Sequence, residues 1–309
     1  MRTLSPRPHS EIPVIKQLLK KTLPPGQYGR LAALKRRLAG DDLVTQVRAA
    51  VVHRSLDAAA LLDLKNEINV VERMDYARRD VLLSVDSRIE YETRLHSCKK
   101  EPDTVEWIET FLKPGDVLFD VGANVGAYSL VAAKFFEGGV RVYAFEPAFL
   151  NYTQLCKNVH LNRCQGSVVP LPVALSDKTA LGVFNYHNLI PGGALHTLGA
   201  AVDHKGEAFE PVFTQHMLSY RLDDLVEQFG VPVPNHIKID VDGIELDVLE
   251  GARETLSNPA LRSVIVELEA GEGERQITEL LASKGFGLHS KHTRWTPGML
   301  NCIFSRKVS

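Results

Sequence analysis

The segment from Asp120 to Gly126 constrains the fold of this chain more than any other. It ends an apolar run, Val117-Leu-Phe119, and a helix-like run follows from Tyr128. An apolar run that turns on glycines into a helix predicts a strand, a sharp turn and a helix. Backbone N–H groups at such a turn face a crevice, and glycine has no Cβ to block a ligand. We therefore expect a nucleotide-like cofactor at this turn.

The spacing of the glycines separates two cofactor classes. A dinucleotide-binding turn reads G-x-G-x-x-G, with a middle glycine that lets a pyrophosphate approach, whereas Gly122 and Gly126 enclose Ala-Asn-Val. Asp120 at the strand tip would repel a phosphate, but it suits a cationic amino group. The turn therefore favours S-adenosylmethionine over NAD.

The next predicted strand, 140–145, ends in Glu146-Pro147. A carboxylate at the tip of the second strand can accept hydrogen bonds from both ribose hydroxyls. Both cofactor classes use this arrangement, so Glu146 does not decide between them. The competing interpretation is an ordinary strand-to-helix turn with a solvated Glu146.

Composition predicts an ordinary soluble globular chain without a membrane span. The 309 residues are 44% hydrophobic and 24% charged, and no apolar run approaches membrane-spanning length. No signal-peptide pattern is present, which predicts a cytoplasmic protein. The four cysteines lack metal-ligand spacing and are expected to be reduced packing residues. Residues 1–60 hold 11 Lys and Arg against 4 Asp and Glu, which favours a face for an acidic partner over a nucleic-acid arm.

The pattern predicts two parts. Residues 1–78 show helical spacing and form an expected helical extension, for dimerisation, for covering the active-site mouth or for shaping the acceptor pocket. Residues 79–309 are expected to form the main domain, beginning with a hairpin at 80–94. Strands and helices then alternate, which predicts a doubly wound parallel sheet. The expected strands are 117–121, 140–145, 168–174, 236–241, 263–268, 286–290 and 300–305.

Residues 176–220 interrupt this alternation. Two strand-like pieces, 181–186 and 208–218, flank a glycine-rich loop at 188–199. Insertions at the carboxyl ends of parallel strands lie over the ligand crevice. This loop is therefore the expected lid on the acceptor side.

Five motifs in order resemble the FkbM family of S-adenosylmethionine-dependent methyltransferases, and the resemblance covers about residues 98–306. The motifs are Lys113-Pro-Gly-Asp-Val-Leu-Phe-Asp-Val-Gly-Ala-Asn-Val-Gly126, Phe145-Glu-Pro147, Val173-Ala-Leu-Ser-Asp177, Arg221-Leu-Asp-Asp-Leu225 and Ile237-Lys-Ile-Asp-Val-Asp-Gly-Ile-Glu245. The resemblance implies an α/β fold, the Rossmann-like class I methyltransferase, with a seven-stranded mostly parallel sheet, helices on both faces and the last strand antiparallel. It also implies transfer to hydroxyl oxygens of sugars and secondary metabolites. One departure is Asp242, where the family motif usually has glutamate.

The cofactor would contact residues at the strand tips. We expect Gly122, Asn124 and Gly126 to line the methionine part, with Tyr128 near its carboxylate and Asp120 or Asp240 near its amino group. The remaining expected contacts are Glu146 and Pro147 at the ribose and Ala174 and Leu175 at the adenine.

Transfer to an alcohol requires removal of its proton, by a base or with the help of a divalent cation. Asp240 and Asp242 are two apart, so a regular strand places them on one face, where they could bind the cofactor's amino group, act as a base or ligate Mg²⁺. Two further catalytic candidates are His196, the best-placed imidazole in the lid for the role of base, and Glu269, which with Glu267 ends the fifth strand. No metal ligand set is assigned, and catalysis by positioning alone stays open.

The predicted function is an O-methyltransferase that acts on a small metabolite or a glycan. A nucleic-acid acceptor is not expected, because the fourth-strand motif is not of the Asn/Asp-Pro-Pro-Tyr/Phe type. Two alternatives are an NAD-linked oxidoreductase and a non-catalytic scaffold. A homo-oligomer through the N-terminal helices is a further expectation.

Overall fold

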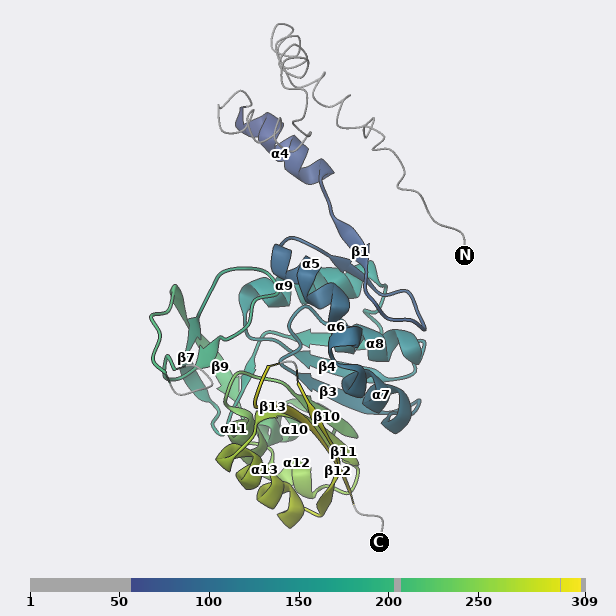
Figure 1. Ribbon diagram of the computed structural model, residues 1–309, viewed down its shortest axis with the longest axis vertical. Coiled ribbons are helices and arrows are strands. Elements are labelled where there is room, and N and C mark those ends of the chain that lie inside the picture. Colours follow the sequence, from purple (N-terminus) through teal and green to yellow (C-terminus); the bar gives the residue numbers. More distant parts are fainter. Residues whose placement is uncertain (1–56, 203–206, 295, 307–309) are drawn as a thin grey trace, which may run out of the picture. The chain divides into compact units, whose positions relative to one another are not determined.

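The computed structural model describes residues 57–202, 207–294 and 296–306 (Figure 1). The chain divides into two units between Asn69 and Val70. The described part of the first unit is helix α4 (Ala58–Glu67), which begins where the Asp57 side chain accepts a hydrogen bond from the N–H of Ala60. The predicted extension lies mostly outside the described residues, so its roles in oligomerisation and in covering the acceptor stay predictions.

The second unit is built on the predicted seven-stranded sheet. Its strand order is β12-β13-β11-β10-β3-β4-β5, and β13 alone runs antiparallel to the other described strands. This confirms the Rossmann-like α/β fold class and the antiparallel last strand. The strands are β3 (Val117–Val121), β4 (Arg141–Phe145), β5 (Val168–Leu171), β10 (His236–Ile239), β11 (Ser263–Glu269), β12 (Phe286–Thr293) and β13 (Met299–Arg306).

Successive side chains of each strand point to opposite faces of the sheet, so a hydrophobic core forms on each face. In β3, Leu118 belongs to one buried cluster while Phe119 and Val121 belong to the other. Successive strand residues point to opposite faces, so an almost wholly apolar strand needs cover on both sides. Helices α7 (Pro102–Phe111), α8 (Ala127–Phe135) and α9 (Phe149–Leu161) cover one face, and α10 (Leu222–Phe229), α11 (Glu245–Glu250), α12 (Arg253–Ser257) and α13 (Glu272–Ser283) cover the other (Figure 1).

The insertion forms a sheet of its own. Strands β6 (Ala174–Leu175), β9 (Phe213–Tyr220), β7 (Ala180–Tyr186) and β8 (Thr197–Leu198) pair in that order. The second predicted strand piece begins later than expected, at Phe213 instead of residue 208. The glycine-rich loop connects β7 to β8, close to the carboxyl ends of the main sheet.

Two local predictions at the start of this unit are wrong. Val71–Arg73, placed in the helical extension, is strand β1, and it pairs with β2 (Leu82–Ser84). The second half of the expected hairpin is helix α5 (Arg88–Glu92), followed by η1 (Arg94–His96) and α6 (Ser97–Lys100). A capping box between Ser87 and Glu90 starts α5, so this pair outweighed the apolar alternation.

The topology fixes where a ligand can bind. Strand β3 lies between β4 and β10. The chain adds β4 and β5 on one side of β3 and later adds β10 and β11 on the other side, so the strand order reverses at β3. Ligands of open α/β sheets bind at the carboxyl ends of strands at such a reversal. Among the helices that the structure describes, none is long and apolar enough to span a bilayer.

Candidate active site at the carboxyl ends of the strands

A cavity of about 250 Å³ opens at this reversal. Its walls come from the ends of β3, β4, β6, β10 and β11 and from the insertion. Of the residues predicted from the sequence, the lining includes Gly122, Asn124, Glu146, Pro147, Ala174, Leu175, His196, Asp240 and Asp242. Segments more than a hundred residues apart therefore meet around one space.

The amides of the glycine turn are all engaged within the protein. Gly122 and Ala123 donate to the Phe145 carbonyl at 3.0 and 2.9 Å, and Gly126 donates to Ala123 at 2.8 Å. The Asn124 amide donates to Glu146 Oε2 at 2.8 Å, and the Val125 amide donates to Asn124 Oδ1 at 3.0 Å. The expectation of free N–H groups at this turn is therefore wrong. A turn without free donors cannot hold a pyrophosphate.

The glycines are required by neighbouring chain segments. Gly122 has φ +77°, and a Cβ there would lie 1.9 Å from the Asp240 carbonyl oxygen. At Gly126, with φ +88°, a Cβ would lie 2.5 Å from Leu155 Cδ1. The sequence argument assigned these glycines to ligand access. In the structure a side chain at either position would collide with the chain at the end of β10 or with helix α9, so packing within the protein favours glycine there.

Glu146 is held rigidly at the tip of β4. It is buried, Oε2 accepts from the Asn124 amide, and Oε1 accepts from the Ala148 amide at 2.8 Å. Burial raises the pKa of Glu146 to about 7, although these two backbone hydrogen bonds oppose the shift. The alternative of a solvated Glu146 does not fit this position.

Asp120 faces a buried lysine instead of the cavity. Lys238 Nζ lies 3.7 Å from Asp120 Oδ1 and 2.9 Å from Asp240 Oδ2, and the Ser129 hydroxyl donates to Asp120 Oδ2 at 2.5 Å. Burial raises the pKa of Asp120, against the attraction of Lys238. For Asp240 burial also favours the neutral form, but Lys238 outweighs it and lowers the pKa to about 2. Asp240 thus carries a stable negative charge at the cavity wall.

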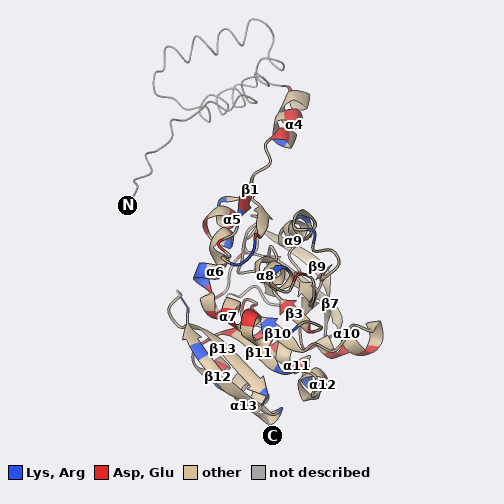
Figure 2. Cartoon of the chain, turned by 90° about the vertical axis from the view of Figure 1, so that its right-hand side faces the viewer, with Lys and Arg blue, Asp and Glu red and all other residues tan. Residues whose placement is uncertain are grey.

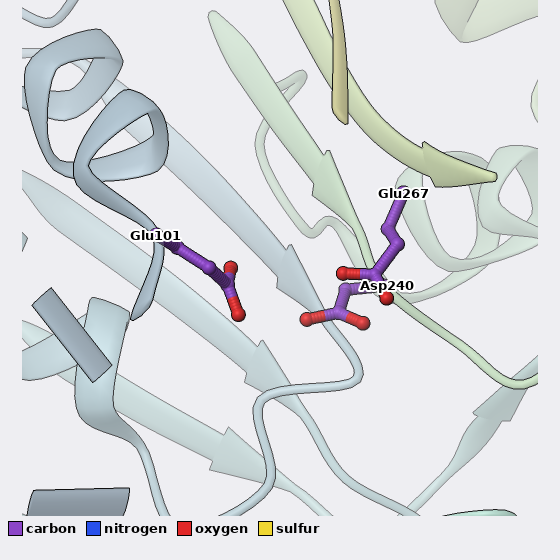
Figure 3. Close-up of side chains that lie close together, drawn as sticks. All are labelled: Glu101, Asp240 and Glu267. Atoms are coloured by element: carbon purple, nitrogen blue, oxygen red, sulfur yellow. The ribbon is translucent and has the colours of Figure 1, made fainter. Parts of the chain in front are cut away.

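Three carboxylates converge on this wall, those of Glu101, Asp240 and Glu267, each with an oxygen within 4.8 Å of the others (Figure 3). Protein cations already neutralise them. Arg294 pairs with Glu101 and lies 2.8 Å from Glu267 Oε2, while Lys238 pairs with Asp240. Acidic and basic ribbon segments accordingly lie next to one another between α7 and β10 (Figure 2). These pairs leave little unbalanced charge to recruit a divalent cation, so we assign no metal ligands here.

The predicted lid is fastened over the cavity. Asn124 and Asn151 both donate to the Gly193 carbonyl, at 2.9 and 3.0 Å, and Arg94 donates twice to the Gly192 carbonyl. Asp242 Oδ2 accepts from the Leu195 amide at 2.6 Å, so the shorter carboxylate of this chain's motif reaches the lid. Burial, followed by the repulsion of Asp240, raises the pKa of Asp242 to about 6.

His196 and Glu269 differ in their access to the cavity. His196 lies in the wall beside the rings of Phe184 and Tyr186, and burial lowers its pKa to about 4. Glu269 lies outside this cavity and lines a smaller one next to it.

Gly126 and Tyr128 also lie outside the lining of the cavity. Gly126 begins α8, and the Tyr128 hydroxyl donates to the Ser97 carbonyl at 3.0 Å, with Lys238 Nζ 5.2 Å from the ring centre. The Tyr128 side chain therefore contacts α6 and does not line the cavity where the carboxylate of the cofactor was expected.

Sequence reasoning missed the basic side chains of the site. Arg94 and Lys100 line the cavity, and Lys238 and Arg294 balance its acids. Lys238 left a signal, because it is a charged residue between Ile237 and Ile239 in a predicted buried strand. Arg294 left none, since its partner Glu101 is 193 residues away.

Glu146 predicts a pH dependence of stability. Its pKa rises from 4.5 to about 7 on folding, so the folded chain binds the extra proton and its stability falls as the pH rises through this window. Glu146→Gln should reduce this fall by up to about 3 kcal/mol. Urea unfolding at the two ends of the window measures it. Glu227→Gln, on the exposed side of α10, should not change the pH dependence.

The sheet order, with its antiparallel last strand, is that of the Rossmann-like methyltransferase fold. The model of the Methyltransferase FkbM domain matches residues 120–295, and the chain belongs to this family. It is therefore an enzyme of the methyltransferase class that uses S-adenosylmethionine.

Relatives agree with this assignment. Hexuronic acid methyltransferase AglP of Haloferax volcanii is 30% identical over 216 residues, or 69% of this chain and 79% of the relative. The 31-O-demethyl-FK506 methyltransferase FkbM of Streptomyces tacrolimicus is 30% identical over 194 residues, or 57% and 74%. A crystal structure of Methyltransferase FkbM from Methylobacillus flagellatus KT has a TM-score of 0.44 at 16% identity, covering 62% of this chain and 43% of that one.

Proposed function

We propose that this enzyme methylates a hydroxyl oxygen of a small metabolite or a sugar. The observation that carries the proposal is the contrast between the glycine turn and the cavity beside it. The turn has no free N–H for a phosphate, while the cavity wall holds Asp240, whose pKa of about 2 keeps it negatively charged. A donor with a sulfonium and an amino group suits such a wall, whereas the two phosphates of NAD do not.

The residues that line the cavity fit S-adenosylmethionine, but two of the contacts expected from the sequence pass to other residues. Glu146 would accept from the ribose hydroxyls, and Ala174 with Leu175 would flank the adenine. Asp240 would hold the amino group, because its charge persists and it lines the cavity. Lys100, also in the lining, replaces Tyr128 as the candidate partner of the carboxylate.

The bound cofactor would supply an electrophilic methyl group, and the protein would hold the acceptor hydroxyl next to it. The fastened lid and the strand tips hold the two reactants together and exclude water. Positioning of this kind contributes on the order of 7 to 11 kcal/mol to a two-substrate reaction. One relative's name specifies an O-methyl position and another a sugar acid, which supports a hydroxyl acceptor.

Calorimetric titration tests the cofactor. We expect S-adenosylmethionine to bind and NADH not to bind, and Glu146→Gln should weaken binding of S-adenosylmethionine by at least about tenfold, because a charge-assisted hydrogen bond is lost. Glu227→Gln is the matched control with unchanged affinity. Binding of NADH without S-adenosylmethionine would favour the oxidoreductase instead, and binding of neither would favour a scaffold.

A further inference from the structure

A second cavity of about 130 Å³ adjoins the first. Leu195, Val241, Asp242 and Glu267 line both cavities and form the wall between them. The second cavity continues to Glu269 and to other residues that the first does not reach. A hydroxyl group in the second cavity would therefore lie beside the side chains that also bound the donor cavity.

Glu267 is fixed in the wall with one oxygen uncommitted. Its Oε2 lies 2.8 Å from Arg294 Nη2, and Arg294 is itself held by Glu101. Neither oxygen of Glu267 makes a hydrogen bond to the residues that the structure describes, and of the two only Oε2 is fully buried. The side chain is 19% exposed, so Oε1 can be reached from a cavity. The ion pair with Arg294 sets the direction of the carboxylate.

The other acids and bases of the wall are less suited to receive a proton. Lys238 holds Asp240 in its charged form with a pKa of about 2, and the pKa of His196 falls to about 4. Asp242 Oδ2 accepts from the Leu195 amide, and this hydrogen bond opposes the rise of the Asp242 pKa, which reaches only about 6.

Some of the groups around Glu267 raise its pKa and others lower it. Burial, and then the charges of Asp240 and Glu101, raise the pKa of Glu267 to about 8, while Arg294 and Lys100 oppose them. A base with a pKa near the working pH transfers protons efficiently.

We propose that Glu267 is the general base, and that the acceptor hydroxyl reaches it from the second cavity. This inference rests on the proposed function. The acceptor O–H proton passes to the Glu267 carboxylate as the oxygen bonds to the methyl carbon. The carbon–sulfur bond breaks, and its electron pair stays on sulfur, which loses its positive charge. Arg294 is a positioning residue that orients Glu267.

The second cavity also restricts the acceptor. Its described lining includes the carboxylates of Asp242, Glu245, Glu267 and Glu269 and holds no Lys, Arg or His. An acceptor carboxylate would meet no cation among these residues, and it would oppose the ionisation of the acids around it. Acceptors that are neutral or carry an amine should therefore be preferred over those that carry a carboxylate.

The test uses the full chain with glucose, glucosamine and glucuronic acid as acceptor probes and release of S-adenosylhomocysteine as the readout. We expect Glu267→Gln to lower kcat by about 10² to 10⁴ and to keep its affinity for S-adenosylmethionine. The rise of activity through about pH 8 should disappear with it. Glu267→Asp should recover part of the rate, and Glu227→Gln should retain all of it.

A second readout requires no acceptor. Burial also raises the pKa of Glu245 to about 8, so infrared difference spectra of the cofactor-free protein should show carboxyl groups that titrate near pH 8, and the signal should decrease but not vanish in Glu267→Gln. An unchanged spectrum, wild-type turnover by Glu267→Gln, or a preference for glucuronic acid would each contradict the inference. Abolition of wild-type turnover by EDTA would point to a metal instead. Failure of the wild type to bind S-adenosylmethionine would contradict the proposed function, which is a separate result.

Discussion

Gly122→Ala is expected to lower the free energy of unfolding by more than about 3 kcal/mol, because it combines a left-handed backbone with a steric clash. The new Cβ would lie 1.9 Å from the carbonyl oxygen of Asp240 and 2.9 Å from its carbonyl carbon. Neither atom can rotate away, since both belong to the backbone at the end of β10. Urea unfolding measures the loss.

Gly115→Ala is the matched control for the clash. Gly115 has φ +93°, but a Cβ there would meet no atom within 4 Å. It should cost about 1 to 2 kcal/mol, the conformational penalty alone. Equal losses at the two positions would show that the close approach of β3 and β10 does not require a glycine.

Lys238→Met is expected to destabilise the protein by about 3 to 5 kcal/mol, because it leaves buried carboxylates without their cation. Lys238 is 4% exposed and lies between Asp120 and Asp240. Asp120 Oδ1 has no hydrogen bond of its own among the described residues, so it depends most on this charge. Unfolding in urea gives the magnitude.

Adding Asp120→Asn to Lys238→Met should recover part of the loss, because it removes the buried charge that the lysine balanced. Lys178→Met is the control, since Lys178 is exposed and pairs with Asp177 on the surface. That variant should change stability by less than about 1 kcal/mol. A double variant no more stable than Lys238→Met would show that packing, and not charge, explains the effect.

The sheet could be predicted because its signals are local. An apolar run such as 117–121 needs cover on both faces wherever it lies, and it forms β3 at the predicted residues. The start of the main domain could not be predicted from alternation alone. Residues 88–92 alternate like a strand, yet the Ser87 and Glu90 cap makes them helical. The alternation and the capping box competed there, and the capping box decided the outcome.

The candidate site was predictable where it follows strand ends. Glu146, Ala174 and Asp240 line the cavity because the carboxyl ends of neighbouring strands meet at one edge. Ion pairs across the fold were not predictable. Whether Asp120 faces a ligand or Lys238 depends on the register of β3 against β10, which pairs the two residues directly.

The sequence by itself determined the class of fold, the order of strands and helices and the place of the cofactor crevice, because each depends on local periodicity and turn residues. Only the tertiary structure decided what the glycines serve and which carboxylates are paired with buried cations. Contacts between distant segments set these properties, and burial with neighbouring charge sets the proton affinity of each acid. The turn from Asp120 to Gly126 thus marks the site, while the chemistry proposed for Glu267 depends on Arg294 and Asp240, which only the fold brings beside it.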